Sequence, residues 1–192
     1  MKEVLLIIDF GSQYTQLIAR RVRELNVCSE IIPYHKFNSI PDNVKAVILS
    51  GSPYSVNDQN APFIDLSLIR KKLPLLALCY GAQFVAREIG GNVAKCETRE
   101  YGRSNLIFQE KSNLFNGVEN KSEVWMSHGD TILELPDSTH LIGSTLDVKI
   151  AAFTLKGEDT FCLQFHPEVY HTFYGSKLLF NFLVQICKFR QS

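Results

Sequence analysis

An excess of charge of one sign is missing from this sequence. Its 20 Lys and Arg residues are balanced by 20 Asp and Glu residues among 192, so the formal net charge at pH 7 is zero. Proteins that bind nucleic acids through the phosphate backbone usually carry a basic excess. The short basic clusters at 20–23 and 70–72 lie in amphipathic stretches and are interpreted as solvated helix faces. We therefore expect no nucleic-acid partner.

Long hydrophobic runs and paired cysteines are also missing. The first apolar run, 4–8, ends at Asp9 and is too short for a secretory signal or a membrane span. The five cysteines include no CxxC pair, and no spacing of His, Cys and Asp suggests a metal site. We expect no membrane partner, no metal, reduced thiols and a cytoplasmic location.

Apolar strands alternate with amphipathic helices in the first half of the chain. Strands are expected at 4–8, 28–33, 45–49 and 75–78, and helices at 14–25, 62–72 and 82–89. This spacing is typical of βαβ units. The second half is richer in strands, expected at 106–108, 123–126, 140–143, 150–153 and 161–165, before a helix at 174–188. The prediction is one α/β domain over 1–192: a single open, mostly parallel twisted sheet with helices on both faces and extra antiparallel strands in the second half.

Cys79 lies where an apolar strand ends and a helix begins, between the small residues Ala77 and Gly81. Small neighbours let a strand and a helix cross closely, as a nucleophile elbow requires. The helix N-terminus would also favour the thiolate. A buried structural thiol is the alternative interpretation of this position.

His166 and Glu168 follow the strand expected at 161–165. Residues two apart on a strand point the same way, and a carboxylate behind an imidazole fixes its tautomer. Because parallel strands end at one edge of the sheet, a triad with Cys79 is favoured over separate structural roles. The turn at 50–53 can offer backbone N–H groups to an oxyanion together with the N–H of Tyr80, although an ordinary turn is the alternative.

Three segments together resemble the class I, or triad, glutamine amidotransferases in order and spacing: LCYGAQ at 78–83, SGSP at 50–53 and FHPE at 165–168. The segments 9–24, 99–102, 125–130 and 168–175 resemble the GMP synthetases in particular. The likeness covers essentially the whole chain. It implies a flavodoxin-like fold and a domain that hydrolyses glutamine.

The resemblance also implies residue roles. Cys79 would attack the side-chain amide of glutamine, giving a γ-glutamyl thioester, while His166, oriented by Glu168, would transfer the proton. The backbone N–H groups of Ser52 and Tyr80 would hold the oxyanion. The glutamine-binding positions of the family match Gly51, Gln83, Ser127, His128, Gly129 and Asp130.

Three residues depart from the family pattern: Ala77 and Ser52 stand where glycine is usual, and Ala82 stands where methionine is usual. We expect the methyl group of Ala77 to be tolerated and Ala82 to change only packing. Ser52 would act through its backbone N–H, but its side chain can restrict the loop and leave the glutaminase quiet until a partner arrives.

The implied partner is the ATP-pyrophosphatase domain or subunit of GMP synthetase, which uses ammonia to convert xanthosine monophosphate (XMP) to GMP. Neither GxxxxGK[ST] nor GxGxxG occurs, so no cofactor is expected in this chain, and ATP and Mg²⁺ are expected in the partner. The chain is then a separate subunit or the N-terminal piece of a longer one. Two alternatives stay open: an amidotransferase for an anthranilate- or CTP-type acceptor, and a catalytically silent regulatory module, against which the intact triad weighs.

Overall fold

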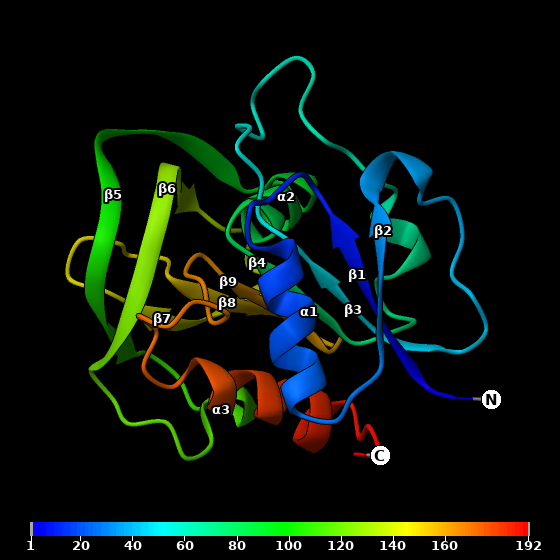
Figure 1. Ribbon diagram of the computed structural model, residues 1–192. Helices are drawn as coiled ribbons and strands as arrows, with labels where there is room; N and C mark the ends of the chain where they lie inside the picture. The colour runs from blue at the N-terminus through cyan, green and yellow to red at the C-terminus, as the bar shows by residue number, and fades with distance from the viewer. Residues whose placement is uncertain (1, 192) are drawn as a thin grey trace.

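A single mixed sheet runs through the molecule and is covered by helices on both faces (Figure 1). The computed structural model describes residues 2–191, and for residues 98–100 it describes the backbone alone. Within these residues the sheet has nine strands in the order β2-β1-β3-β4-β9-β8-β7-β5-β6. Five neighbouring strands are mutually parallel: β2 Ser29–Pro33, β1 Val4–Asp9, β3 Val44–Leu49, β4 Leu75–Leu78 and β9 Thr160–Leu163. The predicted α/β class is confirmed.

The antiparallel part is larger than predicted. It consists of β5 Asn92–Phe108, β6 Ser122–Glu134, β7 Thr139–Ser144 and β8 Ala152–Leu155. The short strands expected at 106–108 and 123–126 are the ends of a long β5–β6 hairpin. The expectation fell short because polar residues, His128 and Asp130, occupy buried positions of β6 and hide the apolar alternation there.

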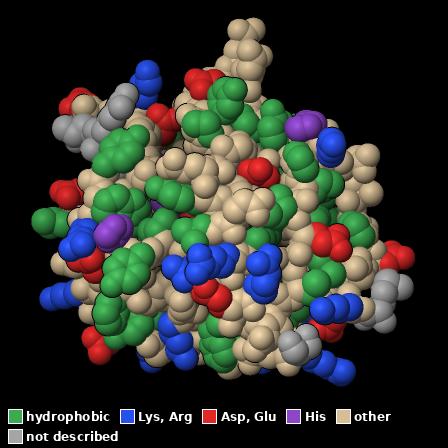
Figure 2. Space-filling model, in the orientation of Figure 1, with side chains coloured by type: hydrophobic (Ala, Val, Ile, Leu, Met, Phe, Trp, Pro, Cys, Tyr) green, Lys and Arg blue, Asp and Glu red, His purple; other side chains and the backbone are tan. Residues whose placement is uncertain are grey.

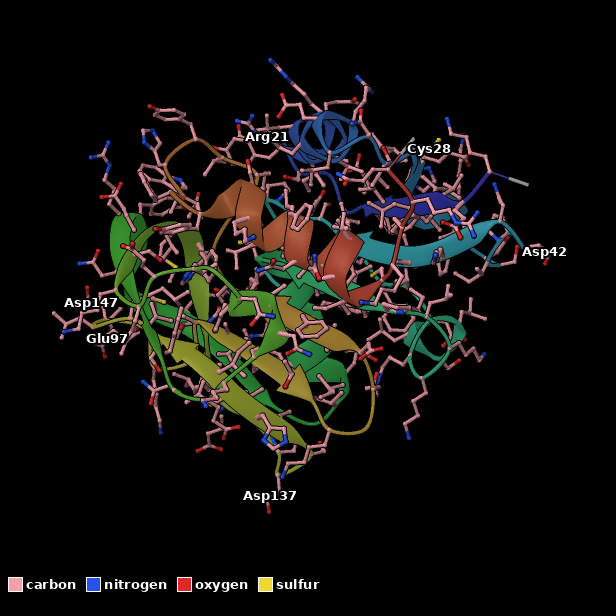
Figure 3. All side chains as sticks on the ribbon, turned by 90° about the horizontal axis from the view of Figure 1, so that it is seen from below. Arg21, Cys28, Asp42, Glu97, Asp137 and Asp147 are labelled. Carbon is pink, nitrogen blue, oxygen red and sulfur yellow. The ribbon has the colours of Figure 1, made fainter. Side chains whose placement is uncertain are left out.

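Three α-helices cover the sheet in the described part of the chain: α1 Thr15–Glu24, α2 Tyr80–Glu88 and α3 Gly175–Phe180, which continues as a π-helical turn, Asn181–Ile186. The apolar sides of α1 and α3 share one core on one face of the sheet, and α2 packs into a second core on the other. Seen from below, α3 lies across the sheet between α1, marked by Arg21, and the hairpin, marked by Glu97 (Figure 3). None of the described helices is long and apolar enough to cross a membrane.

The helix predicted at 62–72 is wrong. The structure has only a 3₁₀ turn there, Leu66–Leu68. The Asp65 carboxylate accepts a hydrogen bond from the Ser67 N–H at 2.9 Å, which caps a tight turn. Lys71 then adopts φ = 60°, a left-handed conformation that ends a helix, and Pro74 follows shortly. Local backbone chemistry thus overrides the apolar spacing.

Charged side chains are spread over the surface. On the face shown in Figure 2, basic and acidic side chains are interspersed, as expected of a chain with equal numbers of each. Large exposed aromatic side chains include Tyr101, Tyr170 and Phe173.

The strand order places a crevice at one edge of the sheet. The order reverses between β1 and β3, because β2 lies beside β1 on one side and β3 on the other. In open α/β sheets such a reversal leaves a crevice at the carboxyl ends of the strands, where ligands bind. The loops that follow β1, β3 and β4 all begin at this edge.

Gly175, the first residue of α3, allows that helix to pack on the loop after β9. A Cβ atom at Gly175 would lie 1.9 Å from the Pro167 carbonyl oxygen. We expect Gly175→Ala to lower the free energy of unfolding by about 2–4 kcal/mol, because helix or loop must move. Gly157→Ala is the control: its φ is 75° but a Cβ there meets nothing within 4 Å, so about 1 kcal/mol of backbone strain is expected. Chemical denaturation measures both variants, and equal losses of free energy of unfolding in Gly175→Ala and Gly157→Ala would contradict the steric overlap at Gly175.

Candidate active site

Cys79 forms a strained elbow between β4 and α2. Its backbone has φ = 48° and ψ = −107°, which is unusual for a residue other than glycine, and its N–H donates to the Leu163 carbonyl at 2.7 Å. Gly81 allows the tight crossing, because a Cβ there would lie 2.8 Å from the Leu49 Cβ. Ala77 is fully buried beneath the elbow. The elbow therefore forms with the extra methyl group in place.

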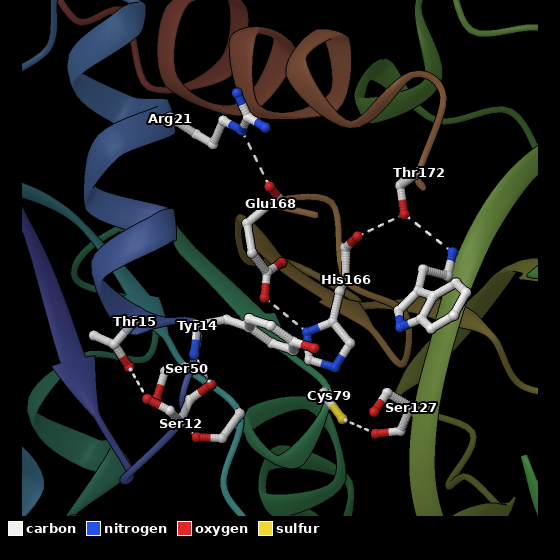
Figure 4. A network of polar contacts seen from close by, with 12 residues as sticks. Ser12, Tyr14, Thr15, Arg21, Ser50, Cys79, Ser127, His166, Glu168 and Thr172 are labelled. Carbon is white, nitrogen blue, oxygen red and sulfur yellow. Dashed lines mark hydrogen bonds and ion pairs between the residues drawn. The ribbon is translucent and has the colours of Figure 1, made fainter. Parts of the chain in front are cut away.

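The structure brings His166 and Glu168 together and points the imidazole toward the thiol of Cys79 (Figure 4). His166 Nδ1 donates to Glu168 Oε1 at 2.7 Å, and the two side chains are 4% and 0% exposed. Gly51 lies between the imidazole and the thiol: a Cβ there would be 3.5 Å from His166 Cε1 and 3.7 Å from Cys79 Cβ. The three predicted triad residues thus meet in one place, and residue 51 lies in van der Waals range of two of them.

The charge of its neighbours keeps His166 protonated. Burial disfavours the imidazolium and by itself would lower the pKa of His166. The negative charges of Cys79 and Glu168, and hydrogen bonds to both, outweigh burial and raise that pKa well above its usual value. The imidazolium form of His166 is therefore favoured at neutral pH.

Contacts outside the triad hold the loop that carries His166. Thr172 Oγ1 donates to the His166 carbonyl at 2.5 Å and accepts from the Trp125 N–H at 3.0 Å. Arg21 Nε, on α1, donates to the Glu168 carbonyl at 3.1 Å. The ring of Tyr14 meets the imidazole edge-on, with centroids 5.3 Å apart. These side chains were missed because their partners are remote in sequence and no local pattern marks them.

The loop after β3 supplies one wall of the site. Ser50 Oγ accepts from the Phe10 N–H at 2.9 Å and donates to the Gly51 carbonyl at 2.8 Å, which fixes the loop against the end of β1. Ser52 Oγ accepts from the Tyr54 N–H, so its side chain is engaged within its own loop. The Tyr80 N–H is the first of α2 and has no acceptor within that helix. Both residues line the cleft described next, as an oxyanion hole requires.

A cleft of about 890 Å³ opens above Cys79. Every predicted oxyanion and glutamine-binding residue lines it, as do Cys79 and His166, while Glu168 lies behind His166. Its remaining walls were not predicted: Gly11, Ser12, Gln13, Tyr14, Pro53, Tyr54, Ser55, Asp58, Lys95, Cys96, Glu97 and Tyr101. Of the segment 99–102, the side chains of Arg99 and Glu100 lie outside the described residues. Among the described residues, no group of His, Cys, Asp and Glu is arranged to hold a metal ion.

Hydrogen bonds fix the polar end of the cleft. Gln83 Nε2 donates to the Asp130 carbonyl at 2.9 Å and to Gln164 Oε1 at 3.0 Å. Because both amide hydrogens are used, Gln83 can offer only its carbonyl oxygen to a ligand. The Asp130 carboxylate accepts a short hydrogen bond from Ser55 Oγ. The thiol of Cys79, one helical turn before Gln83, contacts the Ser127 carbonyl at 3.6 Å.

His128 is a buried neutral imidazole. Its Nδ1 donates to the Asp130 carbonyl at 2.6 Å, and burial lowers its pKa from 6.5 to about 4. Between pH 6.5 and 4 the unfolded chain therefore binds more protons at this site than the folded chain does, so stability falls as the pH falls. The shift corresponds to about 3 kcal/mol.

We expect the free energy of unfolding to drop about 3 kcal/mol more between pH 7 and pH 4 in the unsubstituted chain than in His128→Asn. The amide of asparagine can keep the hydrogen bond to Asp130 without titrating. Urea unfolding at a series of pH values measures the difference. Parallel pH curves for the two proteins would show that His128 carries no such penalty.

Comparisons with known proteins found similar chains over nearly the whole sequence. The family model described as glutamine amidotransferase class-I matches residues 6–186. A GMP synthase (glutamine-hydrolyzing) from Cytophaga hutchinsonii is 58% identical over 188 residues, which are 97% of this chain and 37% of that protein. One from Bacteroides fragilis is 53% identical over 192 residues, 100% and 38% of the two chains. This chain thus spans less than two-fifths of the length of these relatives.

A solved structure covers the same extent as this chain. It is that of a protein from Thermoplasma acidophilum, provisionally assigned as one of the subunits of a GMP synthase, with a TM-score of 0.86 and 31% identity. The match covers 97% of this chain and 94% of that one.

Proposed function

This chain belongs to the class-I glutamine amidotransferases, and from that premise we propose that it hydrolyses glutamine to glutamate and ammonia through a Cys79–His166–Glu168 triad. The observation that carries the proposal is the 2.7 Å bond from His166 Nδ1 to Glu168 Oε1, directly behind an imidazole that faces the thiol on its strained elbow. That arrangement is the one nucleophilic catalysis requires.

The reaction proceeds in two halves. The Cys79 sulfur attacks the γ-carbonyl carbon of glutamine, forming the carbon–sulfur bond of a γ-glutamyl thioester. His166 gives its proton to the departing nitrogen, which leaves as ammonia. A water molecule, deprotonated by His166, then attacks the thioester, and glutamate leaves as the thiol reforms. Glu168 stabilises the imidazolium throughout and holds its tautomer.

Backbone groups carry the charge that develops on the carbonyl oxygen. The N–H groups of Ser52 and Tyr80 are the proposed oxyanion donors, since both residues line the cleft beside Cys79. The amino-acid end of glutamine is proposed to lie against Ser127, His128, Gly129 and Asp130, with Gly51 and Gln83 forming the floor beside the thiol.

We further propose that residues 1–192 are a glutaminase domain whose ammonia serves the conversion of XMP to GMP. The support is that the curated relatives are named GMP synthases and extend well beyond the part that matches this chain. A synthetase domain or subunit would supply the ATP and Mg²⁺ chemistry. The cytoplasm, where this nucleotide synthesis would take place, is the proposed location.

The test measures glutamate and GMP formation from glutamine. The chain is assayed alone, and then with ATP, Mg²⁺, XMP and a GMP synthetase whose own amidotransferase cysteine is replaced. We expect Cys79-dependent glutamate formation that rises when the synthetase is present, because Ser52 restricts the oxyanion loop in the isolated chain. Formation of glutamate without GMP would support the glutaminase activity and refute XMP as the acceptor of the ammonia. No glutamate in either mixture would refute the glutaminase.

A further inference from the structure

Lys95 lies on the inward face of the β5–β6 hairpin. Val93 pairs with Ile132, and both are buried, 6% and 2% exposed. Lys95 is two residues farther along β5 and pairs with Asp130, which is two residues back along β6. Because side chains alternate along a strand, Lys95 and Asp130 project from the same face as that buried pair. Here the inward face leaves the core and becomes the wall of the cleft.

The hairpin opens directly beyond Lys95. The next pair after Lys95 and Asp130 is residue 100 with His128, so residues 96–99 of β5 stand opposite Gly129 alone. An insertion of this kind bends the strand and redirects neighbouring side chains, and it is common beside active sites. Lys95 is accordingly exposed although it is on the inward face, and it lines the cleft.

The charges around the cleft are unequally divided. The described lining residues include three acidic ones, Asp58, Glu97 and Asp130, whereas Lys95 is the only Lys or Arg among them. Asp130 and Asp58 are both tied to Ser55: Asp130 through the Ser55 hydroxyl and Asp58 through the Ser55 N–H at 2.8 Å. An amino acid carries an ammonium and a carboxylate on one carbon, so it needs both an acidic partner and a cation.

We propose that Lys95 Nζ binds the α-carboxylate of glutamine and selects substrates that carry one. The inference rests on the proposed function and adds to it a residue that determines specificity. Within β6, the Ser127 carbonyl contacts the thiol of Cys79, and Asp130 lies three residues, or roughly 10 Å, farther along the strand. Lys95 stands opposite that far end. With its γ-amide at Cys79, glutamine extends its α-carbon along β6 toward Asp130 and Lys95.

The test is glutamine binding to chains in which Cys79→Ala prevents turnover, measured by isothermal titration calorimetry. The ligands are L-glutamine and its α-methyl ester, in which an uncharged ester one methyl group larger replaces the α-carboxylate. We expect Lys95→Met to weaken L-glutamine binding about tenfold and to leave the methyl ester within about twofold. Lys95→Arg should restore most of the affinity for L-glutamine. Lys111→Met, at an exposed lysine outside the cleft lining, is the matched control and should change neither ligand.

Each alternative outcome overturns the inference. Equal weakening for both ligands would assign Lys95 a structural role, and no weakening for either would make it a solvated surface lysine. No measurable binding of L-glutamine to the Cys79→Ala chain would refute the site altogether. Failure of the proposed function is a separate result: a chain that binds glutamine in the Lys95-dependent manner but never forms glutamate.

Discussion

Replacing Cys79 with alanine is expected to reduce glutamate formation to background, a loss of about 10⁵-fold or more. We expect no other side chain to form the thioester, because Cys79 alone among the described thiols is held on a strained turn beside the buried His166–Glu168 pair. Cys79→Ser should be nearly as inactive. A serine hydroxyl is far harder to ionise than a thiol, and the raised pKa of His166 reflects a partner that carries negative charge.

The measurement is the initial rate of glutamate formation with the synthetase component present. Low activity of the isolated chain then does not hide the difference between the unsubstituted chain and the Cys79 variants. Cys28→Ala is the control, because Cys28 lies directly before β2, away from the cleft lining, and the variant should keep full activity. Thioester trapping with hydroxylamine should give the γ-glutamyl hydroxamate only from chains that retain Cys79. Cys79→Ala with more than about one-hundredth of the normal rate would point to a different nucleophile, of which Cys96 on the cleft wall is the first candidate.

The parts of the site that local sequence chemistry dictates could be predicted. Cys79 at a strand end between small residues, and His166 two residues before Glu168, are short-range patterns, and the structure brings them together at one edge of the sheet. The strands β1, β3 and β4 could be predicted for the same reason, because each is a short, almost wholly buried apolar run.

The remainder of the site depends on contacts between residues remote in sequence. Arg21 reaches the Glu168 carbonyl across 147 residues, and Trp125 is joined to Thr172 across 47. Neither Arg21 nor Thr172, whose side chains make these bonds, carries a local pattern that distinguishes it from an ordinary surface or core residue. The hairpin wall was missed for a related reason, since its inward positions at His128, Asp130 and Lys95 are polar because they face a cleft. These polar residues interrupt the alternation of apolar and polar side chains by which the two strands could have been predicted.

Glu168→Gln is expected to lower glutamate formation by about 10²–10⁴-fold while the loop keeps its position. The amide oxygen of glutamine can still accept from His166 Nδ1, and the main-chain bond from Arg21 to residue 168 does not involve the side chain. What is lost is the negative charge that helps to raise the pKa of His166. The imidazolium then deprotonates at lower pH, so less of the chain holds the proton that the leaving ammonia requires. The alkaline limb of the pH–rate profile should therefore move toward lower pH.

The pH dependence of stability in the same variant separates an electrostatic role of Glu168 from a structural one. Glu168 is fully buried, and its Oε2 atom has no hydrogen-bond partner within the described part of the chain, so folding leaves part of a carboxylate's hydration uncompensated. Against that, the charge stabilises the imidazolium of His166, so at pH 7 its removal is expected to lower the free energy of unfolding by about 2–3 kcal/mol. Above the pKa of His166, where the imidazole is neutral in both chains, the difference should shrink to within about 1 kcal/mol or change sign. Urea unfolding at pH 7 and at high pH, with a pH–rate profile on the same preparations, gives these quantities. A loss of stability that is equal at both pH values would show that Glu168 holds the loop, whereas a loss that disappears as His166 deprotonates would show that its charge serves His166.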